Sequence, residues 1–135
     1  MKGTKAIVLD SWAIMAFLQD EPTAVRIADI MADARDEGVP LLMSVINAGE
    51  VWYTVARRRS SRDADQALRW LQEIGIDLVD ADLALTQTAA QFKAKGGISY
   101  ADCFASALAK LNKATLITGD SEFKQLEKEI EIVWL

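Results

Sequence analysis

The 135-residue chain contains no histidine, and this absence excludes several kinds of catalytic site. A serine–histidine–aspartate triad, an imidazole general base and a histidine-rich zinc site all need a side chain that the protein does not have. Any hydrolytic chemistry must therefore use carboxylates, lysine, tyrosine, the single thiol or a bound cofactor.

Cysteine is almost absent as well. Cys103 is the one cysteine, so the chain cannot form an internal disulfide, which suits a reducing compartment. We interpret Cys103 as a small buried side chain and not as a nucleophile, because no histidine is available to activate its thiol.

Long apolar runs are missing from the sequence. No stretch approaches the roughly 18 consecutive apolar residues that a membrane-spanning helix requires. Residues 1–5 lead directly into a short apolar run, without the longer hydrophobic region of a secretory signal. We therefore expect a cytoplasmic protein that does not associate with membranes.

Positive charge is in the minority, with 15 lysines and arginines against 20 aspartates and glutamates and a formal net charge of −5. This balance argues against a protein that coats nucleic acid through bulk charge. It leaves open a nucleic-acid enzyme whose positive charge comes from metal ions.

A length of 135 residues, 51% of them apolar, is enough for one domain with a hydrophobic core, and we expect a single domain over residues 1–135.

Apolar runs and helical patterns alternate along the chain and predict its fold class. Strands are expected at 6–9, 39–43, 76–79, 114–117 and 130–134. Helices are expected at 13–18, 22–37, after Ser44, at 61–74, at 82–95 and from Ser99. Because the strands are continuous apolar runs separated by helices, we predict a three-layer α/β/α fold with a central, mostly parallel sheet of four to five strands.

Spacing also predicts which sides of two helices are buried. The helix after Ser44 has an apolar face of Val45, Ala48, Trp52 and Val55. The helix from Ser99 has an apolar face of Ala101, Phe104, Leu108 and Leu111. Pro40 indicates an edge strand or the start of a strand. We interpret Trp52, Trp70 and Trp134 as packing residues.

Four acidic residues fall where ligands bind in an open α/β sheet, beyond the carboxyl ends of the strands. Asp10 directly follows the strand at 6–9, and Asp120 follows the strand at 114–117 after a short turn. Asp102 lies in the first turn of one helix and Glu50 in the second turn of another. All four can reach one rim of the sheet.

Each acid also has an ordinary structural interpretation, which the sequence leaves open. Asp10 and Asp120 can be helix caps or turn residues. Asp102 can complete a capping box, since it lies three residues after Ser99. Glu50 can be a solvated side chain on the flank of its helix.

The electrostatic cost of bringing the four acids together determines what such a cluster requires. Two carboxylates about 4 Å apart repel by roughly 4 kcal/mol at an effective dielectric constant near 20, whereas a domain is stable by only about 5–15 kcal/mol. Such a cluster therefore needs a bound cation or raised pKa values. Oxygen ligands suit Mg²⁺ or Mn²⁺, and these ions can polarise a phosphodiester and activate water without histidine.

The four acids lie in segments whose order resembles that of a known family. These segments read VLDSWAIMAFL at 8–18, NAGEVWY at 47–53, SYADCFASALA at 99–109 and TLITGDSEF at 115–123. Together they resemble the acidic motifs of PIN-domain proteins, in particular the VapC-type toxins of prokaryotic toxin–antitoxin pairs. The resemblance covers nearly the whole chain.

The resemblance implies a PIN-like fold and a metal-dependent endoribonuclease. The residues that match the acids of the family are Asp10, Glu50, Asp102 and Asp120. By this resemblance they hold one or two Mg²⁺ or Mn²⁺ ions and activate water against an RNA phosphodiester. It also implies an RNA substrate, a cognate antitoxin protein and a homodimer.

Three further positions compare differently with the family. Thr118 matches the hydroxyl residue often found beside the fourth acid. Ser11 stands where a threonine is common and keeps the hydroxyl. Trp12 departs from the pattern, because a small residue is usual there, and this departure concerns the wall of the pocket and not the acids.

Arginines are concentrated in one segment of this acidic chain. Five of the seven lie between positions 57 and 69, namely Arg57, Arg58, Arg59, Arg62 and Arg69. We interpret Arg57, Arg58, Arg59 and Arg62 as a surface that grips RNA phosphates. A solvated helix end, where cations complement the helix dipole, explains the same residues, and the sequence leaves both interpretations open.

Two other functions are compatible with a sheet of this type. One is a different metal-dependent phosphohydrolase or phosphoacceptor. Against it, a dehalogenase-type enzyme needs a second aspartate where this chain has Trp12, and a receiver-type domain needs an acid next to Asp10. The other is a non-catalytic PIN-like binding module, and the presence of all four acids argues against it.

Overall fold

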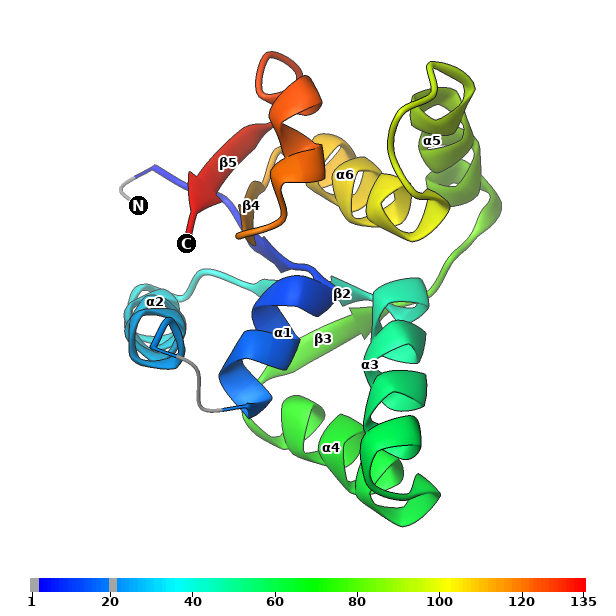
Figure 1. Ribbon diagram of the computed structural model, residues 1–135. Helices are drawn as coiled ribbons and strands as arrows, with labels where there is room; N and C mark the ends of the chain where they lie inside the picture. The colour runs from blue at the N-terminus through cyan, green and yellow to red at the C-terminus, as the bar shows by residue number, and fades with distance from the viewer. Residues whose placement is uncertain (1–2, 20–21) are drawn as a thin grey trace.

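A five-stranded sheet lies at the centre of the protein in the computed structural model, which describes residues 3–19 and 22–135 (Figure 1). Its strands are β1 (Ile7–Leu9), β2 (Leu41–Ser44), β3 (Ile76–Val79), β4 (Thr115–Thr118) and β5 (Glu131–Trp134). They lie in the order β3-β2-β1-β4-β5, and every neighbouring pair is parallel. The predicted α/β/α class with a parallel sheet is confirmed.

Helices cover both faces of the sheet (Figure 1). They are α1 (Ser11–Leu18), α2 (Ala24–Glu37), α3 (Val45–Arg58), α4 (Ser61–Glu73), α5 (Leu83–Ala94), α6 (Tyr100–Asn112) and the 3₁₀ helix η1 (Ser121–Leu126). One core cluster joins one sheet face to α1–α4, and a second joins the other face to α5, α6 and η1. Successive strand residues such as Ile7 and Val8 enter opposite clusters, which is why the strands read as unbroken apolar runs.

Capping side chains set most helix starts where the sequence predicts them. The side-chain oxygens of Ser44, Asp82 and Ser99 accept hydrogen bonds from backbone N–H groups in the first turns of α3, α5 and α6. Each such cap contributes about 1 kcal/mol to helix stability. Gly38 ends α2 with a left-handed φ of 71°, which glycine adopts without steric cost. Helix α1 begins earlier than predicted, at Ser11, because Asp10 caps it.

Of the two interpretations of Pro40, the structure bears out the start of a strand and not an edge, and it corrects the prediction for the exposed end of α6. Strand β2 lies inside the sheet, between β3 and β1, so Pro40 does not mark an edge. It precedes Leu41, where its missing N–H is not needed, and its carbonyl accepts from the Ile7 N–H at 2.9 Å. Leu111 was predicted to be buried but is 51% exposed, because the covered part of α6 ends at Ala109.

The buried side of α3 also differs from the predicted face. The buried residues of this helix are Asn47, Ala48 and Val51, whereas Trp52 is partly exposed. The Trp52 indole N–H instead donates to Asp65 on α4 at 2.9 Å. Because Asn47 is polar, a search for regularly spaced apolar residues does not identify this side of α3 as the buried one.

Among the residues described, no helix is both long and apolar enough to cross a membrane.

Candidate active site

Asp10 lies at the carboxyl end of β1, where it is both a helix cap and a member of the acidic site. Its Oδ1 accepts from the Ala13 N–H at 2.8 Å, and its Oδ2 accepts from the Thr118 hydroxyl at 2.5 Å. The side chain is only 1% exposed. The two interpretations left open for Asp10 are therefore compatible, because one oxygen caps α1 while the carboxylate charge stays beneath the site.

Thr118 connects the two aspartates that follow the central strands. Residues Leu9 and Ile117 are register partners of β1 and β4, so the next residue of each strand comes close to the other. The Thr118 hydroxyl donates to Asp10 and accepts from the Asp120 N–H at 3.0 Å. This hydroxyl therefore fixes the start of the loop that carries Asp120 relative to Asp10.

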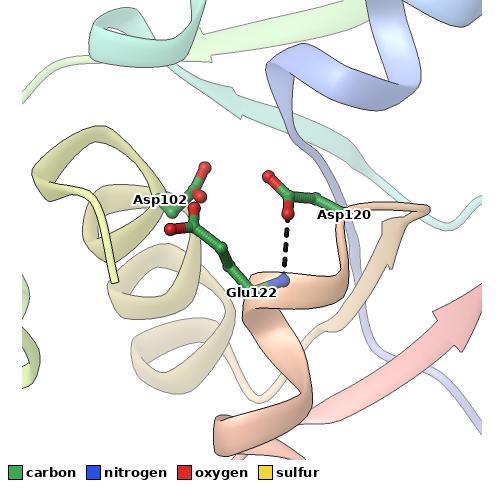
Figure 2. Close-up of side chains that lie close together, drawn as sticks. All are labelled: Asp102, Asp120 and Glu122. Atoms are coloured by element: carbon green, nitrogen blue, oxygen red, sulfur yellow. Dashed lines mark hydrogen bonds between the residues drawn. The ribbon is translucent and has the colours of Figure 1, made fainter. Parts of the chain in front are cut away.

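Asp102, Asp120 and Glu122 form a cluster of three carboxylates (Figure 2). Each offers one oxygen, and these oxygens all lie within 4.8 Å of one another. Asp102 projects from the first turn of α6, where its N–H donates to Ser99. Asp120 caps η1 by accepting from the Glu122 N–H at 3.0 Å, and this places both side chains at the start of η1.

Glu122 is a member of this cluster that the sequence analysis missed. An acidic residue in the first turn of a helix is ordinary, since it complements the helix dipole. The one signal that could have found it is its position two residues after Asp120, in a short turn following a central strand.

Glu50 on α3 lines the same pocket as the three-carboxylate cluster, and two side chains hold it. The Ser11 hydroxyl donates to Glu50 Oε1 at 2.9 Å, and the Asn47 side-chain amide donates to the same oxygen at 3.1 Å. The Asn47 amide also donates to the Ala101 carbonyl at 3.1 Å, which ties α3 to α6. Both acceptors require an N–H donor, so the orientation of this buried amide is determined by its contacts. Asn47 is a second residue that the sequence analysis missed.

The pocket between these elements has a volume of about 380 Å³. Its lining includes the carboxylates of Glu50, Asp102, Asp120 and Glu122, together with Ser11, Trp12 and Tyr53. Asp10 and Thr118 are not part of the lining and lie beneath it. The four predicted acids and Ser11 thus lie close together. The lining of the pocket includes Ser11, Glu50, Asp102 and Asp120, whereas Asp10 lies beneath it.

The electrostatics of the site favour a bound cation. Burial raises the pKa of Asp10 to about 7, against the hydrogen bonds from Thr118 and Ala13, and the charges of Asp120 and Glu50 raise it further. Burial also raises the pKa of Asp102 to about 8, with added effects from Glu122 and Asp120. Gathering carboxylates in this way disfavours their charged forms, and a divalent cation with a preference for oxygen ligands compensates for it. The donor set therefore fits such an ion.

The predicted arginines lie beside this pocket on the exposed end of α3 and the start of α4. Arg57, Arg58, Arg59 and Arg62 are all exposed. The Arg57 guanidinium lies 5.0 Å from the ring centre of Tyr53, which itself lines the acidic pocket. Arg58 and Arg59 line an adjoining groove of about 490 Å³. Over residues 3–19 and 22–135 the one ion pair is Lys95–Glu129, so the charges of these arginines remain available.

Comparison with known proteins places these features in a family context. A family model described as "PIN domain" matches residues 7–129. The chain is 29% identical over 129 residues to Ribonuclease VapC30 of Mycobacterium tuberculosis, covering 90% of this chain and 95% of that protein.

Two solved structures of Mycobacterium tuberculosis proteins share the fold of this chain. One is VapC20, described as a sarcin–ricin loop cleaving toxin, with a TM-score of 0.71, 17% identity and coverage of 89% and 94% of the two chains. The other is VapBC-5, a member of the VapBC family of toxin–antitoxin systems, with a TM-score of 0.62, 19% identity and coverage of 97% and 99%.

Proposed function

Since this chain belongs to the PIN-domain family, we propose that it is a metal-dependent endoribonuclease and the toxin of a toxin–antitoxin pair. The observation that carries the proposal is the convergence of Asp102, Asp120 and Glu122 at the carboxyl end of the sheet, with Glu50 in the same pocket. The similarity to Ribonuclease VapC30 supports RNA as the substrate.

Different residues of the chain have different roles in such a site. Asp102, Asp120 and Glu122 would hold Mg²⁺ or Mn²⁺, and Asp10 would add negative charge from below. When bound, such an ion polarises a phosphodiester and makes water a better nucleophile. Glu50 is fixed through Oε1 by Ser11 and Asn47, which leaves its other oxygen to orient a water molecule and accept its proton.

Partners follow from the same proposal. The similarity to the fold of VapBC-5, a toxin–antitoxin system, supports a cognate antitoxin protein as the partner of this chain. A homodimer and a cytoplasmic location complete the proposal and stay predictions.

Cleavage of total cellular RNA by the purified protein tests the function. We expect cutting with Mg²⁺ or Mn²⁺ and none with EDTA, because the carboxylates have no cationic side chain to replace the ion. Hydrolysis of a phosphate monoester in place of RNA would assign the chain to another class of metal-dependent phosphohydrolase. Metal binding by calorimetry without either activity would indicate a non-catalytic module.

The double variant Arg58→Gln/Arg59→Gln is expected to weaken the salt dependence of RNA binding. Each phosphate contact with single-stranded nucleic acid contributes about 0.7 to the slope of log K against log salt, so the slope should fall by about 1.4. The measurement is fluorescence anisotropy of a labelled RNA oligonucleotide between low and physiological salt.

A matched control removes two charges at the other end of the sheet. Lys113 and Lys128 are exposed and lie shortly before β4 and β5 begin, away from the pocket. Lys113→Gln/Lys128→Gln should leave the slope unchanged. Equal slopes for the arginine variant and the unmodified protein would favour the solvated helix end that the sequence left open.

A further inference from the structure

Trp12 is a large aromatic side chain that the function proposed above does not use. It lies in the first turn of α1, two residues after Asp10, and is 37% exposed. It lines the acidic pocket and also an adjoining groove of about 440 Å³ whose wall includes Arg58. Trp12 therefore borders both the pocket of the carboxylates and the groove that Arg58 lines.

The position of the Trp12 ring is determined by Gly119. A Cβ atom at Gly119 would lie 2.3–2.6 Å from three carbons of the six-membered ring of Trp12, far inside van der Waals contact. Gly119 does not have a positive φ, so its backbone conformation does not require glycine. What requires glycine is the ring, which lies against the backbone between Thr118 and Asp120. The indole thus lies directly against the loop that carries Asp120.

A partly exposed indole that borders both a carboxylate pocket and a groove with a guanidinium suits one kind of ligand. Single-stranded nucleic acid presents phosphates to both charged sites and a flat base between them. Stacking of a base on an aromatic side chain tolerates any base, because every base has a π-face. A core residue would instead be buried, as are Phe104 and Phe123 at 3% and 0% exposure.

We propose that Trp12 binds and positions the substrate: one nucleobase of a single-stranded RNA stacks on its indole, next to the phosphodiester that the carboxylates address. This inference rests on the proposed ribonuclease function and names how that site holds its substrate. Trp12 does not touch the reacting atoms, so it acts on binding and on the choice of the cleaved position.

The test is binding of a 12-nucleotide oligoadenosine RNA in EDTA, where cleavage does not interfere. Trp12→Leu should raise the Kd by about 10- to 100-fold, the size expected for one base–aromatic stack, and should remove the quenching of tryptophan fluorescence that RNA causes. Mn²⁺ affinity and the melting temperature should stay the same. The matched control is Trp134→Leu, since Trp134 is partly exposed on β5 and lines neither the acidic pocket nor the two grooves at Arg58.

Gly119→Ala provides a second variant that keeps the indole but displaces it. It should raise the Kd in the same direction as Trp12→Leu. In the double variant the two effects should not add, because without the ring the new methyl group has nothing to displace. Gly119→Ala by itself keeps the inference testable if Trp12→Leu fails to fold.

Several results would overturn the inference. Unchanged Kd and unchanged quenching in Trp12→Leu would do so, as would additive effects in the double variant or an equal effect of Trp134→Leu. Failure of the unmodified protein to bind oligoadenosine would overturn it as well. A Trp12→Leu protein that binds RNA normally but loses its protein partner would assign the ring to that partner and overturn it too. Normal RNA binding and stacking without metal-dependent cleavage would instead count against the proposed function alone.

Discussion

Asp102→Asn is expected to lower metal-dependent RNA cleavage by at least about 100-fold, because even the outer partners of metal ligands typically contribute 10–100-fold to metal affinity or activity. The substitution keeps the shape of the side chain and removes one of three carboxylates that lie within 4.8 Å of one another. The Asp102 N–H still donates to Ser99, so the start of α6 is retained. The loss should therefore come from the site and not from the fold.

The melting temperature distinguishes a functional acid from a structural one. Without metal, Asp102→Asn should melt at or above the temperature of the unmodified protein, since burial raises the pKa of Asp102 and its charge is unfavourable in the folded state. Asp29→Asn, at an exposed position on α2, is the matched control and should cleave RNA normally. An inactive Asp102→Asn protein that has also unfolded would assign Asp102 a structural role.

Glu122→Gln belongs to the same experiment because only the tertiary structure brings Glu122 to the site. Weaker Mn²⁺ binding in calorimetry would make Glu122 a ligand of the cluster. Unchanged affinity would leave the ion to the remaining carboxylates.

The metal-free protein is expected to lose stability as the pH rises from about 4 to about 8, by roughly 4 kcal/mol from Asp10 alone. The pKa of Asp10 is about 7 in the folded state, against an ordinary value of 3.8. Between these two values the folded protein binds a proton that the unfolded chain has released. Unfolding therefore releases a proton, and a higher pH favours the unfolded state. The raised pKa of Asp102 acts in the same direction.

Urea unfolding at pH 5 and pH 8 measures this effect, once in EDTA and once with Mn²⁺. In EDTA the protein should be less stable at pH 8. Metal at 100 times its Kd should add about 2.7 kcal/mol, since it binds only the folded state. Asp10→Asn should reduce the pH dependence to the part that Asp102 contributes, because asparagine does not titrate, and its side-chain oxygen can still cap α1 at Ala13. Stability that rises from pH 5 to pH 8 in EDTA would contradict the prediction.

Local sequence patterns predicted most of the fold because the forces behind them are local. Strand β3 has the predicted bounds, and Ser44, Asp82 and Ser99 cap the helices that follow them. Where long-range packing decides, the patterns were wrong. The buried side of α3 includes Asn47, and Leu111 lies beyond the part of α6 that other elements cover.

The sequence by itself determined the elements, their order and the chemistry available to the site. Without histidine and with an acid following β1 and β4, it left carboxylates and a cation as the means of hydrolysis, and the parallel order placed Asp10 and Asp120 at one end of the sheet.

Only the tertiary structure decided which side chains meet there. It brought Glu122 to Asp102, placed Asp10 beneath the pocket, fixed Glu50 through Ser11 and laid the Trp12 ring against Gly119. These contacts join elements far apart in the chain, and their geometry depends on how helices pack on the sheet. Spacing along one element cannot report that packing.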